Sequence, residues 1–176
     1  MQVSQFGRAV GPGDLLFRSP VSLAYDVTSG RIFAADPDTG CVKIFDARCN
    51  YSAEFGGSIS TSGGRSPKTG NGNNSATLDN PVSVCCDGLG NAVVCDSGSK
   101  RVMLFSRDGR YLCNLVDFRK ATVSPRWQLG RRRSDSKEVI PVCVGLSSPG
   151  RRIAVSLENR LHGFRKLVVH NVSPEL

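Results

Sequence analysis

An internal repeat is the feature of this sequence that most constrains its fold. The stretch Pro81–Phe105, PVSVCCDGLGNAVVCDSGSKRVMLF, has nearly the same arrangement of residue types as Pro20–Phe45, PVSLAYDVTSGRIFAADPDTGCVKIF. The two copies share landmarks at matched spacing, namely Pro20 and Pro81, Asp26 and Asp87, Asp36 and Asp96, and Phe45 and Phe105. Repeats of this length are units that bury their apolar surface by stacking on one another. The sequence therefore predicts an array of similar units.

Each unit is predicted to consist of short strands, which we call A to D in chain order. Strand A follows from the alternation of apolar with small or polar residues at 21–26 and 82–87, a period of two. Strand B is a near-continuous apolar run at 32–35 or 92–95, which suits a strand covered on both faces. Strand C is predicted at 42–45 or 102–105, and strand D at 51–55 or 111–116. We expect the following side chains to be buried: Val21, Leu23, Val82, Val84, Val94 and Phe105.

A third, degenerate copy begins at Pro141. Val142, Val144 and Leu146 repeat strand A, and residues 153–155 repeat strand B at the same distance from the Pro as in the first copy. Ser156 is assigned the place of the second Asp, and a further strand is predicted at 167–172.

These residues resemble NHL repeats, the blades of a six-bladed β-propeller found in several enzymes and at the C-terminal end of TRIM-NHL proteins. The family pattern of Phe-Gly, Gly-rich linker, Pro, alternating strand, apolar-Asp and a final Phe is followed over 6–45 and 55–105. The resemblance is closest over 6–56 and 81–112 and extends less closely over 141–170. The family implies a structural Asp–Arg pair in each blade. That pair is open for the first blade, because Cys41 stands where the second copy has Arg101.

We therefore predict an all-β fold, a partial β-propeller of about three four-stranded NHL-type blades, which belong to a six-bladed ring. The single segment 1–176 is divided into repeat 1 at about 6–56, a linker at 57–80, repeat 2 at about 81–116, a basic insertion at 117–140 and repeat 3 at about 141–176. Closed propellers have roughly four to eight blades, so three do not close a ring. Two explanations are open. The chain is part of a longer propeller, with residues 1–7 as an outer strand of a preceding blade, or two three-blade halves form one ring as a homodimer.

Composition and cysteine usage indicate a soluble cytoplasmic protein without membrane contact. The apolar runs have the length of strands, and the N-terminal residues lack the basic start and apolar core of a secretory signal. The seven cysteines are an odd number and contain no CxxC pair, so we interpret them as buried free thiols of a reducing compartment.

The positive charge of the chain is concentrated in one part of it. Residues 100–137 contain 11 basic and 3 acidic side chains, whereas residues 1–99 contain 7 and 9. Clustered Arg and Lys bind phosphates, and an aromatic ring beside them can stack on an unpaired base. If strands A to D are antiparallel, the B–C loops and the D–A connections share one rim, which brings residues 100–101 and the insertion together. The candidate RNA-binding residues are Lys100, Arg101, Arg119, Lys120, Arg126, Trp127, Arg131, Arg132 and Arg133. A solvated basic loop without a ligand is the alternative interpretation.

The resemblance to TRIM-NHL proteins implies a non-catalytic module that binds single-stranded or stem-loop RNA in post-transcriptional regulation. The alternative function is a protein-interaction platform, the substrate-recruiting part of a TRIM-type ubiquitin ligase, whose activity would need a RING that this sequence lacks. We predict no catalytic residue, no cofactor and no metal site. His162 and His170 match no zinc motif, and P-loop, GxGxxG and GxSxG motifs are absent from the sequence. The repeat landmarks Pro20, Asp36, Phe45, Pro81, Asp96 and Phe105 are assigned structural roles.

Overall fold

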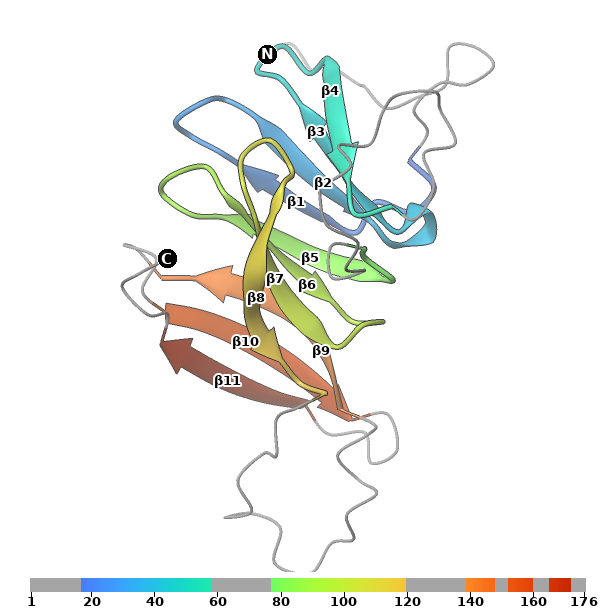
Figure 1. Ribbon diagram of the computed structural model, residues 1–176, viewed down its shortest axis with the longest axis vertical. Coiled ribbons are helices and arrows are strands. Elements are labelled where there is room, and N and C mark those ends of the chain that lie inside the picture. Colours follow the sequence, from blue (N-terminus) through green and yellow to red (C-terminus); the bar gives the residue numbers. More distant parts are fainter. Residues whose placement is uncertain (1–16, 58–76, 120–138, 148–151, 160–164, 172–176) are drawn as a thin grey trace, which may run out of the picture.

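The computed structural model describes residues 17–57, 77–119, 139–147, 152–159 and 165–171. Over these residues the regular structure is β-strand, apart from one turn of 3-10 helix, η1 (Pro37–Thr39). The strands form three antiparallel sheets, which follow one another along the long axis of the molecule (Figure 1). The predicted all-β class is confirmed. No helix among the described residues is long and apolar enough to cross a membrane.

Each sheet is a meander, in which strands that follow one another in the chain are hydrogen-bonded neighbours. We call the sheets blades 1, 2 and 3. Blade 1 contains β1 (Ser22–Tyr25), β2 (Ile32–Asp36), β3 (Cys41–Phe45) and β4 (Tyr51–Phe55). Blade 2 contains β5 (Pro81–Cys86), β6 (Ala92–Asp96), β7 (Arg101–Phe105) and β8 (Tyr111–Asp117). The described part of blade 3 contains β9 (Val139–Leu146), β10 (Arg152–Asn159) and β11 (Arg165–Asn171).

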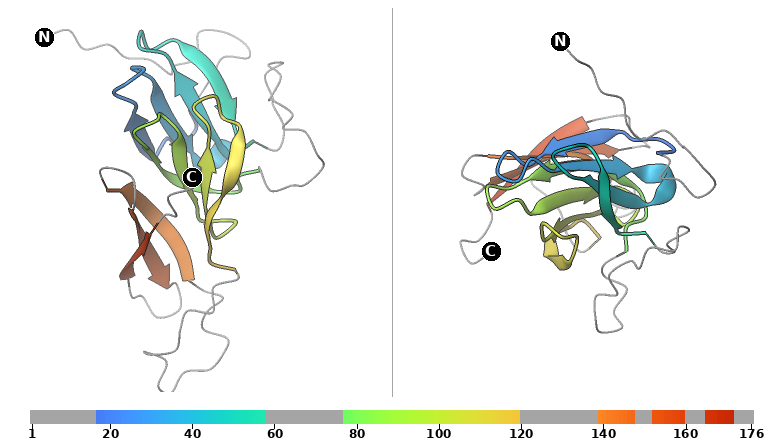
Figure 2. Two further views of the ribbon diagram at one scale, coloured as in Figure 1. Left: turned by 60° about the vertical axis from the view of Figure 1, so that its left-hand side comes forward. Right: turned by 90° about the horizontal axis from the view of Figure 1, so that it is seen from above.

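The first strands of the three blades, β1, β5 and β9, lie in contact with one another in this order, and Figure 2 shows the stack from two further directions. The Ser of the repeated Pro-Val-Ser joins each of these strands to the next. The backbone N–H of Val84 donates to Ser22 Oγ at 3.1 Å, and the N–H of Val144 donates to Ser83 Oγ at 3.3 Å. The repeated serine thus satisfies a backbone donor of the following blade.

The apolar core lies between the blades. One cluster joins blades 1 and 2, and includes Phe33, Ile44, Phe55, Val94 and Phe105. Phe55 and Phe105 pack against each other across this interface with ring centroids 4.5 Å apart. A second cluster joins blades 2 and 3 through side chains that include Val93, Val102, Leu104, Ile153 and Val155. Strands β6 and β7 contribute to both clusters, which explains their near-continuous apolar sequences.

The predicted burial of strand A is wrong for blade 1. Val84, Val94 and Phe105 are buried and Val82 is half-buried, whereas Val21 and Leu23 are exposed. In β1 it is Ser22 and Ala24 that face blade 2. Because side chains alternate between the two faces of a strand, the apolar set of β1 faces away from the other blades.

The register of blade 3 also corrects the assignment of Ser156. Pro81 lies opposite Asp96, and Pro141 lies opposite Leu157, while Ser156 pairs with Cys143. Leu157, which is buried, therefore stands in the place of the repeated Asp. In both blades the strand register shifts one residue after the Pro, as at a β-bulge. An alignment of the repeats by residue number ignores this shift, and it therefore assigns Ser156 instead of Leu157 as the partner of Pro141.

We predict that Phe105→Ala destabilises the protein by about 3 to 5 kcal/mol, because it removes a fully buried ring from the interface between blades 1 and 2. Leu89→Ala, in the exposed turn between β5 and β6, is the control and should change the free energy of unfolding by less than about 0.5 kcal/mol. Urea unfolding followed by circular dichroism measures both. Equal midpoints for Phe105→Ala and the wild type would contradict the assignment of the core.

Candidate functional site

The predicted meeting of the B–C loop of blade 2 with the start of the basic insertion is observed. The backbone N–H of Phe118 donates to the carbonyl oxygen of Lys100 at 3.0 Å. Lys100 has a φ of +57°, and Gly40 has the equivalent place in blade 1 with a φ of +63°. A lysine in this left-handed conformation is unusual, since only glycine adopts it without strain. We call the surface formed by Lys100, Asp117, Phe118 and Arg119 the basic rim.

Arg119 is held on the basic rim by the carboxylate of Asp117. Its Nε donates to Oδ1 at 2.9 Å and its Nη2 donates to Oδ2 at 2.7 Å, which is a two-pronged ion pair. These hydrogen bonds raise the pKa of the Arg119 guanidinium. The ion pair with Asp117 fixes the orientation of the guanidinium. Because the side chain is half exposed, its remaining N–H groups are accessible to solvent.

Burial excludes Arg101 from the candidate phosphate contacts. It is only 6% exposed, and its Nε donates to Ser99 Oγ at 2.9 Å while its Nη2 donates to the carbonyl oxygen of Thr77 at 3.2 Å. The expectation that Arg101 binds RNA is therefore corrected: the side chain fastens the connection that leads into blade 2.

The other predicted RNA-binding residues, Lys120, Arg126, Trp127 and Arg131–Arg133, lie outside the described residues. Two further basic residues of the charged region, Arg107 and Arg110, belong to the turn between β7 and β8. There Arg107 Nη2 donates to the carbonyl oxygen of Leu89, in the turn between β5 and β6. Since these turns and the B–C loop lie at opposite ends of the strands, Arg107 and Arg110 do not add to the basic rim.

Asp36 and Asp96 are buried and hold the chain where it enters a blade. Asp36 accepts hydrogen bonds from the backbone N–H groups of Arg18 (2.9 Å) and Ser19 (3.0 Å). Asp96 accepts equivalent bonds from Asp79 (3.1 Å) and Asn80 (2.7 Å). In both blades the donors are the two residues that precede the repeated Pro. Each carboxylate thus binds the backbone that leads into its blade. Blade 3 has Leu157 in place of the Asp, and there the two residues before the Pro, Val139 and Ile140, pair with β10 as part of the sheet.

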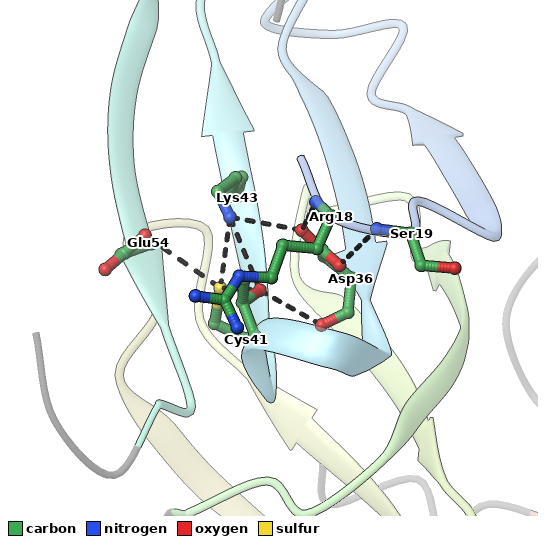
Figure 3. A network of polar contacts seen from close by, with 7 residues as sticks. Arg18, Ser19, Asp36, Cys41, Lys43 and Glu54 are labelled. Carbon is green, nitrogen blue, oxygen red and sulfur yellow. Dashed lines mark hydrogen bonds and ion pairs between the residues drawn. The ribbon is translucent and has the colours of Figure 1, made fainter. Parts of the chain in front are cut away.

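The cation that partners Asp36 is Lys43, on β3 (Figure 3). Its Nζ lies 3.3 Å from Asp36 Oδ2, 3.4 Å from Thr39 Oγ1 and 5.6 Å from the centroid of the Phe17 ring. Lys43 is buried. It lies two residues after Cys41, and Cys41 is the residue that corresponds to Arg101 of blade 2. Sequence reasoning missed this pairing. The sequence does contain an indication of it, because Lys43 lies within the apolar run CVKIF. A lysine in a buried strand needs a partner for its charge.

The Cys41 thiol lies in the same network, 3.6 Å from Lys43 Nζ and 3.9 Å from Glu54 Oε2 (Figure 3). Burial raises the pKa of this thiol, and the hydrogen bond to Thr39 and the charge of Lys43 offset the effect only in part. The thiol therefore stays protonated at neutral pH and is a poor nucleophile. All seven cysteines lie within the described residues and are free thiols, of which Cys41 and Cys95 are buried. The described ranges contain no cluster of His, Cys, Asp and Glu suited to a metal ion.

Comparison with known proteins supports the β-propeller fold. No protein-family model matches the chain, and no curated protein gives a significant match. Among solved structures, hydrazine synthase of Kuenenia stuttgartiensis is similar over 97% of this chain and 40% of its own, with 11% identity and a TM-score of 0.51. The nidogen/laminin complex is similar over 87% of this chain and 49% of its own, with 12% identity and a TM-score of 0.51.

Regucalcin of Agrobacterium tumefaciens, a calcium-binding protein, gives a TM-score of 0.46 at 15% identity, over 82% of this chain and 39% of its own. The chain thus spans less than half the length of each of these solved structures. At such identities the likeness concerns the fold alone. The three meander sheets and the likeness to the nidogen/laminin complex identify the chain as a partial β-propeller.

We predict that Asp36→Asn weakens the dependence of stability on acid pH. Burial raises the pKa of Asp36, but the N–H groups of Arg18 and Ser19 and the charge of Lys43 outweigh it, so the pKa lies below its ordinary value of 3.8. A lowered pKa stabilises the folded protein above the ordinary pKa, and this contribution is lost as the pH falls below about 4. Asp36→Asn should cost about 1.5 to 3 kcal/mol at pH 7 and show a smaller loss between pH 5 and pH 3.

Asp38→Asn, an exposed residue of the 3-10 helix η1 next to Asp36, removes the same charge and is the control for this experiment. It should retain the stability of the wild type at pH 7. Urea titrations at several pH values measure these free energies. If Asp36→Asn follows the same pH profile as the wild type, the carboxylate is not the buried acceptor described here.

Proposed function

We propose that this chain is a non-catalytic binding module of the NHL type, which binds single-stranded or stem-loop RNA through the basic rim in post-transcriptional regulation. The observation that carries the proposal is the hydrogen bond from Phe118 N–H to the Lys100 carbonyl, which fixes Lys100 beside the start of the insertion. Residues 117–140 contain 7 basic and 3 acidic side chains. Of these basic residues Arg119 is described by the structure, and Lys100 adds a further positive charge beside the start of this segment.

The two cations of the basic rim suit phosphate in different ways. Lys100 provides a compact ammonium on a loop whose backbone is held by Phe118. Arg119 provides a planar donor set whose direction is set by Asp117. Contacts from such cations to phosphate position a nucleic acid without reading its bases, so we expect binding to RNA of any sequence.

The experiment combines Lys100→Gly with Arg119→Gln in the full chain. Glycine is chosen because Gly40 has the same conformation at the equivalent place, so the change removes charge without adding strain. The slope of log affinity against log salt for a short single-stranded RNA should flatten by about 1.4, from about 0.7 for each lost phosphate contact. Affinity at physiological salt should fall on the order of tenfold.

Arg48→Gln with Arg110→Gln is the charge-matched control, since both residues are exposed in turns at the opposite end of the blades. This control should leave the salt slope close to that of the wild type. Equal losses for the two pairs would show that only net charge matters, and the basic rim would not be the RNA site.

A second prediction separates RNA from an acidic protein partner. Trp127, the only tryptophan of the chain, lies in the basic insertion and outside the described residues. Stacking on a base should quench its fluorescence when a short single-stranded RNA is added, and Trp127→Ala should weaken binding by about 1 to 3 kcal/mol without changing the salt slope. An acidic peptide should leave the fluorescence unchanged. Quenching by the peptide and not by RNA would favour the protein-interaction platform instead.

A further inference from the structure

Cysteines from two blades lie close together where β9 of blade 3 meets blade 2. Strands β5 and β9 each form an edge of their own sheet and lie in contact with each other. Ser83 of β5 pairs with Cys95 of β6, and Cys85 stands two residues further along β5, so these side chains share one face of blade 2. That face packs against blade 3, because Cys95 and Cys85 both contribute to the apolar cluster between these blades.

Cys143 of β9 adds a thiol from blade 3. Its Sγ lies 3.8 Å from Ser83 Oγ, and the backbone N–H of the next residue, Val144, donates to the same Oγ at 3.3 Å. Burial raises the pKa of Cys95, and the charge of Cys143 raises it further. Burial also raises the pKa of Cys85 to about 12, and the charge of Cys143 contributes to this shift. Cys143 is thus a near neighbour of both thiols of blade 2.

Cys95 is the better placed partner for Cys143. Residues paired across antiparallel strands have Cβ atoms about 4.5 to 5.5 Å apart, whereas residues two apart on one strand are separated by about 6.5 Å. Cys95 is therefore closer than Cys85 to Ser83, whose hydroxyl lies beside the Cys143 sulfur. The two partners differ in access, since Cys143 is exposed and Cys95 is fully buried. An exposed thiol beside a second thiol is the arrangement of a redox-sensitive pair.

We propose that hydrogen peroxide oxidises Cys143 and that Cys95 then forms a disulfide with it, which ties blade 3 to blade 2. In the first step the Cys143 sulfur attacks one oxygen of the peroxide, the O–O bond breaks, and the other oxygen leaves with the thiol proton as water. In the second step the Cys95 sulfur attacks the sulfenic sulfur, the S–O bond breaks, and the hydroxyl leaves with the Cys95 proton as a second water. Each cysteine loses one electron, and the peroxide gains both.

The disulfide closes a loop of chain that contains the basic insertion. Residues 96–142 lie between the two cysteines and include β7, β8 and the insertion at 117–140. Blade 3 has Leu157 in place of the Asp that holds the entering chain of blades 1 and 2. The disulfide supplies a covalent link at this entry, and closing such a loop lowers the conformational entropy of the unfolded chain. The oxidised protein is therefore more stable than the reduced one, whether or not the insertion binds RNA.

Peptide mapping of the native full chain after treatment with a stoichiometric amount of hydrogen peroxide tests the proposal. Cleavage before Asp residues places Cys95 in the peptide 87–95, apart from the cysteines of β5 in the peptide 79–86. A disulfide between the peptides that contain Cys95 and Cys143 is expected, within a single chain on a non-reducing gel. Linkage of Cys143 to another cysteine or to a second chain, or oxidation of Cys143 without a disulfide, would overturn the proposal.

Cysteine variants separate the two roles. Cys143→Ser and Cys95→Ser should each lower the cross-linked fraction at least tenfold, and in Cys95→Ser the sulfenic acid on Cys143 should react with dimedone. Cys49→Ser, in the turn between β3 and β4 of blade 1, is the control and should cross-link like the wild type. Cys95→Ala replaces Cys95→Ser if the latter fails to fold.

Urea unfolding tests whether the disulfide ties the blades together. Oxidation should raise the urea midpoint of the wild type, and dithiothreitol should return it to that of the untreated protein. The midpoint of Cys143→Ser should not respond to the same treatment. An oxidised wild type with an unchanged midpoint, or a Cys95→Ser variant that cross-links as fully as the wild type, would contradict the proposal.

Discussion

The structure depends on burial between blades. Each sheet has apolar side chains on its inward faces and no core of its own, so Phe33, Phe55 and Phe105 are buried only because two sheets face each other. Blade 2 is covered on both sides and supplies β6 and β7 to both clusters. This constraint explains the repeat in the sequence. A blade with a neighbour on each side needs apolar residues on both of its faces, so similar residues recur at similar positions in each copy.

Polar groups then fix where the chain enters each blade. Asp36 and Asp96 each bind the two backbone N–H groups before the repeated Pro, but they differ in the cation that accompanies this arrangement. Blade 1 pairs Asp36 with Lys43, whereas in blade 2 Arg101 binds Ser99 and the Thr77 carbonyl beside Asp96. Blade 3 has Leu157 in place of the carboxylate and pairs the entering residues by backbone hydrogen bonds. The donors at the start of a blade are therefore satisfied in two ways, by a buried carboxylate in blades 1 and 2 and by backbone pairing in blade 3.

The strands and their order could be predicted from the sequence, because period-two alternation and the spacing of the landmarks report directly on local geometry. Which face of a strand is covered could not. Val21 and Leu23 look like core residues by composition, and only the position of blade 1 at the end of the array explains their exposure. Arg101 shows the same limit at the candidate site. The sequence places Arg101 next to Lys100 on the basic rim. Only the folded structure shows that its guanidinium turns inward and donates to Ser99 Oγ and the Thr77 carbonyl oxygen.

Native-state hydrogen exchange measures most directly whether stability resides between the blades. If it does, the amides of β6 and β7 should exchange only through global unfolding, with the highest protection in the chain, because both faces of these strands are covered. The exchange free energies of these amides should fall together with the global value in Phe105→Ala. Exchange of β6 and β7 at lower free energy than β2 and β3 would contradict the account, since blade 2 would then open while the blade beside it stayed folded.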